Sequence, residues 1–393
     1  GYNTAVGYNT GQAMTTGVQN TLIGALAGDA ITSGHSSTAL GYAALSTEDT
    51  SSHNTAIGYA AMASGQNAAK NVAVGNNTLT SMQPASNTDT YNVAVGYNAG
   101  LSVTTGTVNT IIGGLAGDAL TTGTRNTAVG AFALSTEDAH GNNTAFGYQA
   151  LLTLNAGAEG YNVAVGVDAG RLMSTGVANT IIGGLAGDAI TTGGYNVALG
   201  YDALGANTIG NSNIAIGTGT MSTNVAADRN VAIGTNALQN MTSASTADTY
   251  NTAVGYEAGG AVTTGTANTL IGGLAGDALT TGHSNVAIGY AALSSEDEHG
   301  GNVAIGKDAL TVQNAGAHAY NVAVGHQAGL AVTTGIQNTL VGGLAGDAIT
   351  SGCENVAVGY DTLSAIDSGS RNTAMGYQAL KTLNVGGIGA NTA

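Results

Sequence analysis

A five-residue phrase sets the hydrophobic pattern of this chain. It reads Asn-Thr-Ala-Val-Gly at residues 3–7, and variants of it recur up to residue 391. The second position is β-branched, the third is Ala in most copies, and the fourth is always apolar, so the side chains alternate over three to four residues. This period of two predicts a short β-strand. The closing Gly predicts a turn with positive φ or a close backbone approach.

The phrase opens with Asn in every copy except one, which has Ser37. An Asn side chain can hydrogen-bond to its own backbone in a turn, and equivalent Asn residues in stacked copies can form a ladder. We therefore expect the Asn residues to have a structural role.

The spacing of the phrase predicts the fold. Most copies begin 17 residues apart, and a few intervals are 19 or 21 residues. So short a unit buries a core only by stacking on its neighbours. We predict an all-β protein, a parallel β-roll or β-solenoid of about 22 repeats, in which each coil has two short strands and two turns. At about 4.8 Å per coil, the body would be elongated, on the order of 100 Å long.

The repeats are of two kinds. Eight residues after the Asn, one kind has Leu or Met, such as Leu134, whereas the other has Gly, such as Gly117, and places its apolar residue three positions later, at Leu120. We expect each coil to use one of these apolar side chains on its return limb. The kinds follow one another in a block of nine coils, and Asp29 and Asp188 show its length of 159 residues. We interpret residues 1–393 as a single repetitive segment of a longer protein.

Composition limits the possible partners. The chain has 63 Gly, no Trp and only two Phe, which suits a thin core between close backbones. Seven basic residues against 23 acidic ones give a formal charge of −16, which disfavours nucleic acid and membrane surfaces. No apolar run is long enough to insert into a membrane, and Cys353 is the single cysteine. Because so thin a roll is marginal alone, we expect a homotrimer.

The repeats at residues 143–151 and 372–380 resemble the head repeats of trimeric autotransporter adhesins of the YadA kind. They are more similar still to the Asn-Thr-Ala-x-Gly-Tyr-x-Ala-Leu arrays of trimeric phage tail-fibre shafts. The resemblance covers nearly the whole chain. It implies a non-catalytic trimeric shaft that takes part in host attachment. For a phage fibre it implies a place on the virion tail, and for an adhesin it implies the bacterial cell surface.

Two glycine-rich stretches lack the features that catalysis or cofactor binding would need. Residues 301–308 have the spacing of a phosphate-binding loop up to Lys307, but Asp308 stands where a hydroxyl should bind magnesium. The Gly-Leu-Ala-Gly-Asp segment ending at Asp118 differs in spacing from calcium-binding glycine-rich turns. No Ser has a nucleophile setting. We expect neither an enzyme nor a bound cofactor.

Two acidic clusters with a histidine are weak candidates for a metal site. They are Glu137, Asp138 and His140, and their copies Glu296, Asp297 and His299. Carboxylates can bind a hard cation, particularly where three chains meet. Solvated turn charges that prevent edge-to-edge aggregation are the alternative, and we favour it.

The longer repeats are the better candidates for receptor binding, because extra residues in a solenoid form lateral loops. These loops are residues 82–91, 241–250, 156–161 and 315–320. The candidate contact residues are Met82, Asp89, Tyr91, Met241, Asp248, Tyr250, Tyr161 and Tyr320. Ten further Tyr residues directly follow the Gly of the phrase, where we expect packing over a turn in preference to sugar stacking.

Our leading functional hypothesis is the shaft of a phage tail fibre, whose partners would be two further copies of the chain, other tail proteins and a host-surface receptor, with a glycan as one candidate. A bacterial trimeric surface adhesin is the alternative. Ice binding is a minor alternative, because Thr-Thr-Gly occurs only in the Gly-type coils and a continuous Thr row is therefore interrupted.

Overall fold

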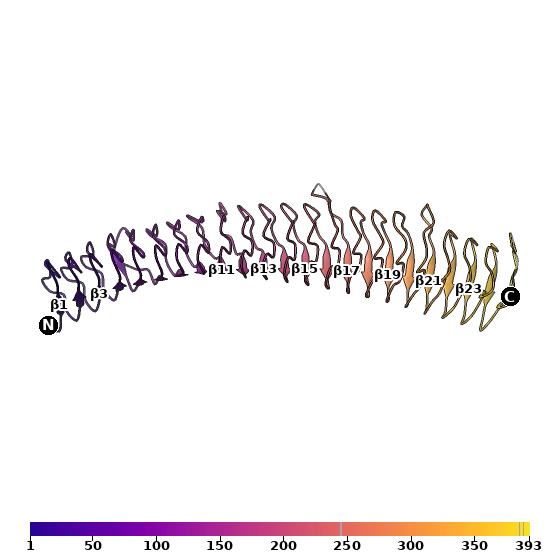
Figure 1. Cartoon of the computed structure of the whole chain (residues 1–393), viewed down its shortest axis with the longest axis horizontal. Coiled ribbons are helices and arrows are strands. Elements are labelled where there is room, and N and C mark those ends of the chain that lie inside the picture. The colour runs from indigo at the N-terminus through magenta and orange to yellow at the C-terminus, as the bar shows by residue number, and fades with distance from the viewer. Residues whose placement is uncertain (244–245, 385, 388) are drawn as a thin grey trace. The chain divides into compact units, whose positions relative to one another are not determined.

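The computed structural model describes residues 1–243, 246–384, 386–387 and 389–393. The chain forms two compact units, Gly1–Tyr195 and Asn196–Ala393. Both are parallel β-solenoids, with about 22 turns in all, and the described residues contain no helix (Figure 1). Accordingly, no membrane-spanning helix occurs in the described part of the chain. The predicted all-β solenoid is confirmed.

All strands except β5 and β7 are three residues long, and each of these three-residue strands begins directly after the Asn or Ser that opens the phrase. The first unit contains β1 (Thr4–Val6), β2 (Thr21–Ile23), β3 (Thr38–Leu40), β4 (Thr55–Ile57), β5 (Ala68–Ala69), β6 (Val72–Val74), β7 (Thr88–Asp89), β8 (Val93–Val95), β9 (Thr110–Ile112), β10 (Thr127–Val129), β11 (Thr144–Phe146), β12 (Val163–Val165) and β13 (Thr180–Ile182). The second unit contains β14 (Val197–Leu199), β15 (Ile214–Ile216), β16 (Val231–Ile233), β17 (Thr252–Val254), β18 (Thr269–Ile271), β19 (Val286–Ile288), β20 (Val303–Ile305), β21 (Val322–Val324), β22 (Thr339–Val341), β23 (Val356–Val358) and β24 (Thr373–Met375).

Within each unit, the strand of one coil pairs in parallel with the strand of the next. The register matches equivalent positions of the phrase, as for Thr127 with Thr144. The prediction of two strands per coil is wrong. In the described residues a second strand occurs only as β5 and β7, which pair with each other. The return limb elsewhere consists of turns, since left-handed residues recur there and interrupt extended backbone.

The predicted alternation of side chains is confirmed. In β10, Ala128 is fully buried between Thr127 and Val129, which are half-buried on the outer face. Ala fits the inner position because the strand and the return limb of one coil lie close together. The outer face keeps its β-branched and apolar side chains uncovered within the single chain.

The Asn residues form the expected ladder. Asn109 is fully buried, and its Oδ1 accepts the backbone N–H of Asn126 at 2.9 Å. Its Nδ2 donates to the carbonyl of Gly123 at 2.9 Å and to Oδ1 of Asn92 at 3.1 Å. Each Asn thus joins the two ends of its own coil and links that coil to both neighbouring coils, and most coils of both units repeat these bonds.

The closing Gly of the phrase is needed for two reasons. Gly113 has φ of 135°, and a Cβ at this position would lie 2.5 Å from the carbonyl oxygen of Gly130 in the next coil. Both the conformation and the contact exclude a side chain. The predicted turn is confirmed.

The two kinds of coil bury the expected apolar side chains, but some coils bury one at both positions, as with Leu151 and Leu154. Leu134 and Gly117 occupy equivalent positions and both are left-handed, with φ of 52° and 49°. Leu134 is fully buried, whereas in the other coil Leu120 is the buried residue. A Cβ at Gly117 would lie 2.9 Å from Cδ1 of Leu120 and 3.5 Å from Ile111. The Gly therefore makes room for larger side chains elsewhere in the coil.

Candidate functional site

One inward-facing position distinguishes the coils chemically. It lies eleven residues after the Asn or Ser of the phrase, and in many coils it carries an apolar residue such as Leu120. In other coils the same position carries a fully buried polar residue. These residues include Glu48, Glu137, Asn207, Asn224, Glu296 and Gln313.

The buried acids and the two buried Asn residues cap a turn. Oε1 of Glu137 accepts the backbone N–H of His140 at 3.1 Å, and Oε1 of Glu296 accepts that of His299 at 3.2 Å. Asn207 makes the same bond to the N–H of Gly210. The interpretation of Glu137 and Glu296 as solvated turn charges is therefore wrong, because both side chains are 0% exposed and satisfy a backbone donor inside the coil.

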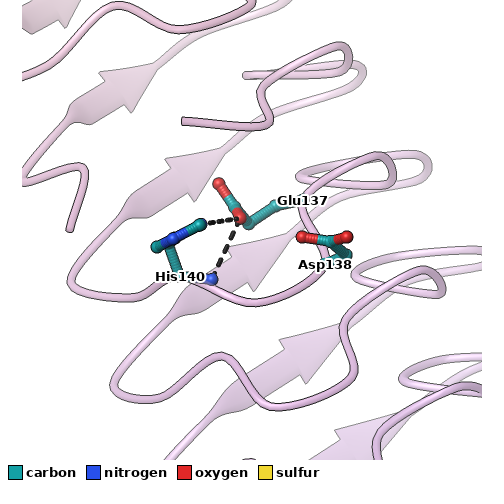
Figure 2. Close-up of side chains that lie close together, drawn as sticks. All are labelled: Glu137, Asp138 and His140. Atoms are coloured by element: carbon teal, nitrogen blue, oxygen red, sulfur yellow. Dashed lines mark hydrogen bonds and ion pairs between the residues drawn. The ribbon is translucent and has the colours of Figure 1, made fainter. Parts of the chain in front are cut away.

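Each of these two glutamates lies beside an imidazole. We name the group Glu137, Asp138 and His140 the Glu137 corner (Figure 2). Nδ1 of His140 is 3.4 Å from Oε1 of Glu137, and it is buried without a hydrogen-bond partner. One ligand atom from each of the three residues lies within 4.8 Å of the others. Asp138 is exposed at the mouth of the group.

Its copy in the second unit, the Glu296 corner, consists of Glu296, Asp297 and His299. Nδ1 of His299 lies 3.7 Å from Oε1 of Glu296, and this nitrogen also has no hydrogen-bond partner. Oε2 of Glu296 is buried without a well-formed hydrogen bond. Burial raises the pKa of Glu296, and the bond from the His299 N–H and the charge of that imidazole partly offset the increase.

A third related turn lacks the imidazole. Glu48 occupies the same inward position, and its Oε1 accepts the backbone N–H of Ser51 at 2.9 Å. Its Oε2 is buried without a partner, and burial raises the pKa of its carboxyl group. The turn cap thus forms with or without a histidine.

Two of the candidate receptor contacts are wrong. Met82 and Met241 are 0% exposed, so neither side chain is available to a receptor. Each lies eleven residues after its Asn and supplies a second buried apolar side chain on the return limb, after Leu79 and Leu238 respectively. The methionines therefore belong to the core of the 21-residue coils.

The other candidate contacts in the loop of residues 82–91 lie at the surface in a small cluster. Nζ of Lys70 is 2.6 Å from Oδ2 of Asp89 and donates to the hydroxyl of Tyr91 at 3.2 Å. The same ammonium lies 5.2 Å from the centre of the Tyr91 ring. Both partner residues were predicted to be receptor contacts, and both are exposed. Lys70 was not predicted.

The second 21-residue coil repeats the cluster with a guanidinium group. Arg229 pairs with Asp248 and donates to the hydroxyl of Tyr250 at 2.9 Å. Lys70 and Arg229 each directly precede an Asn of the phrase and lie 159 residues apart, which is the signal that could have identified them. Charge-assisted bonds order the side chains of both clusters.

The 19-residue coils place Tyr161 and Tyr320 at the surface, with more than half of each side chain exposed. The ring centre of Tyr320 is 6.0 Å from that of His318, which in turn lies 6.1 Å from that of His299. The second of these loops is therefore close to the Glu296 corner.

The ten Tyr residues that follow the phrase are 47–73% exposed. Where adjacent coils both carry Tyr, the rings can stack on each other, as Tyr42 does on Tyr59 at 5.4 Å and Tyr360 on Tyr377 at 5.8 Å. The rings are thus exposed aromatic surface, and each leaves at least one face or edge in contact with water.

Comparison with known proteins does not assign the chain to a family. No protein-family model matches the chain, and no curated protein matches it either.

Proposed function

We propose that this chain is a shaft segment of a homotrimeric fibre that takes part in host attachment, with a phage tail fibre as its setting. The observation that carries the proposal is the outer row of the sheet, formed by the fourth position of the phrase. In the first unit this row exposes Ile23, Leu40, Ile112 and Phe146, and in the second unit Leu199, Ile271 and Met375. Phe146 is 54% exposed and Met375 is 64% exposed.

A contiguous apolar row of this kind favours association. Contiguous exposed apolar patches in soluble proteins generally mark an interaction surface. Cyclic association would cover the same row on every copy, because each chain presents an identical surface. The choice of three copies rests on the resemblance to trimeric shafts.

Sedimentation velocity on the full chain tests the assembly. We expect a species of three times the 38.1 kDa chain mass. The variant Phe146→Lys combined with Ile112→Lys should dissociate it, since both side chains belong to the outer row. The matched control is Leu172→Lys, whose side chain is exposed on the return limb and should leave the trimer intact. A stable monomer at all concentrations would refute the proposal.

Attachment would use the exposed loops of the 21-residue coils. The Lys70 and Arg229 clusters present a cation, a carboxylate and an aromatic ring side by side, a combination that suits a glycan or another polar receptor. Binding of the labelled chain to an array of bacterial surface glycans, compared with Lys70→Ala, tests this part. Equal binding by the variant would exclude the Lys70 cluster as a contact.

The same architecture fits a bacterial surface adhesin as the second candidate. The gene that encodes the chain distinguishes the two, since a tail-attachment domain joined to these repeats supports a fibre and a membrane anchor supports an adhesin. The outer face of the sheet also carries Thr as the first residue of many strands, so thermal hysteresis should be measured. A freezing-point depression without ligand would favour ice binding instead.

A further inference from the structure

We propose that the Glu137 and Glu296 corners each bind one divalent transition-metal ion, with zinc as the best-fitting ion, through the glutamate, the neighbouring aspartate and Nδ1 of the histidine. This inference is independent of the fibre proposal, because it rests on side chains within one chain.

The spacing of the donor atoms suits a small tetrahedral ion. Zinc binds His nitrogen and carboxylate oxygen at about 2.0–2.2 Å, so two of its tetrahedral ligands lie about 3.4 Å apart. The corresponding Oε1–Nδ1 distances are 3.4 Å in the Glu137 corner and 3.7 Å in the Glu296 corner. The aspartate oxygen lies within 4.8 Å of both atoms, and rotation of its side chain closes the remaining gap.

Unsatisfied buried atoms supply the second, independent argument. In both corners Nδ1 of the histidine is buried without a hydrogen bond, and it faces Oε1 of a glutamate that is 0% exposed. Burial of a carboxylate is costly, and a metal ion bound between Oε1 and Nδ1 would neutralise its charge more completely than the imidazole alone. The orphaned atoms thus lie where an ion would need ligands.

The turn cap does not prevent metal binding. A carboxylate oxygen has two lone pairs, so Oε1 of Glu137 can accept the His140 N–H and still bind an ion. His140 is partly exposed, which allows its Nε2–H to bond to water while Nδ1 binds the metal. A water molecule would complete the tetrahedron.

The donor set distinguishes among ions. Calcium takes six to eight oxygen ligands, which these corners lack, whereas an imidazole nitrogen with carboxylates suits zinc and its neighbours. The turn at Glu48 provides an internal control, because it has the buried carboxylate and Asp49 but Ser51 in place of the imidazole.

Isothermal titration of the full chain, prepared without added histidines, with zinc alone tests the proposal. We expect two ions per chain. His140→Ala and His299→Ala should each remove one ion, and the double variant should bind none. Glu137→Gln should also remove one ion while it keeps the turn cap, because Gln313 shows that an amide fits this inward position. Circular dichroism verifies the fold of each variant.

Matched controls define the results that would overturn the proposal. Glu48→Gln and His35→Ala should retain two ions per chain. Absence of binding at millimolar zinc would reduce the corners to carboxylate–imidazole ion pairs and refute the metal site. The metal site would also be refuted if the double variant of His140 and His299 bound as many zinc ions per chain as the parent. Loss of an ion in His318→Ala but not in His299→Ala would assign that ion to the neighbouring imidazoles His283 and His318, whose rings are 4.8 Å apart, and would equally refute it.

Discussion

Replacement of one ladder residue by Ala tests whether the Asn residues hold the coils together. Asn109 is the best position, because it lies between coils of the standard 17-residue length and is fully buried. In Asn109→Ala, the N–H of Asn126 loses its acceptor and the carbonyl of Gly123 loses its donor. Oδ1 of Asn92 retains the backbone N–H of residue 109.

The expected magnitude follows from these two orphaned groups. A buried polar group left without a partner costs about 1–3 kcal/mol. Asn109→Ala should therefore reduce the free energy of unfolding of the surrounding coils by about 2–6 kcal/mol. Water that enters the gap would bring the value toward the lower end of this range.

The chain itself provides the matched control. Ser37 occupies the ladder position in another coil, and its Oγ accepts the N–H of Asn54 at 3.2 Å. Asn109→Ser should keep the equivalent acceptor and lose only the donor to Gly123, so its cost should be about 1–3 kcal/mol. The difference between the two variants isolates the bond to the Asn126 N–H.

Hydrogen exchange followed by mass spectrometry is the appropriate assay, because a repeat protein can open locally without unfolding as a whole. The peptides that contain β9, β10 and β11 should lose protection, while peptides from distant coils should not change. Equal effects of the Ala and Ser variants, or a loss below about 1 kcal/mol for the Ala variant, would refute the view that these hydrogen bonds stabilise the stack.

Three further predictions concern the closing Gly of the phrase, the buried carboxyl group of Glu48 and the core residue Leu134. Gly113→Ala forces a Cβ against the carbonyl of Gly130 at a positive φ, so the urea midpoint should fall markedly, whereas Gly114→Ala meets no atom within 4 Å and should leave it nearly unchanged. Burial raises the pKa of Glu48 in the folded state, so this carboxyl group costs stability as pH rises from the unfolded pKa through the folded one. Glu48→Gln should therefore melt at a higher temperature than the parent at pH 7 and at the same temperature in acid below both pKa values, and the opposite order would contradict the assigned cause. Leu134→Ala should cost about 2–5 kcal/mol by leaving a cavity in the coil, which chemical denaturation measures against Val129→Ala on the outer face.

The strand half of each coil could be predicted from the sequence because its requirements are local. Period-two alternation placed Ala128 inward, and the invariant Gly113 indicated a turn that admits no Cβ. The recurrence of the phrase set the register even across the longer coils, since pairing of equivalent positions follows from stacking. The Asn ladder could also be predicted, because stacking of the coils places equivalent Asn residues one above another.

The return limb could not be predicted in the same way, because its contacts depend on the stack. Glu137 looks like a surface charge within an acidic run, yet its side chain enters the coil to cap the turn at His140. Met82 looks like a loop residue but fills the core. The position eleven residues after the Asn or Ser carries Leu, Ile, Val or Met in most coils but Glu, Asn, Gln or Gly in others, so the hydrophobic pattern does not reveal that the polar residues there also face inward.

The 159-residue block keeps each longer coil together with the coil that holds its loop. Each extra loop is held by a residue of the coil before it: Lys70 binds Asp89 of the first 21-residue coil, and Glu137 accepts the N–H of Ala156 in the first 19-residue coil at 3.2 Å. Arg229 repeats the first arrangement. A longer coil copied alone would lose this partner, whereas copying it together with the preceding coil preserves the contact. Duplication of the whole block therefore copied both kinds of loop together with their anchors.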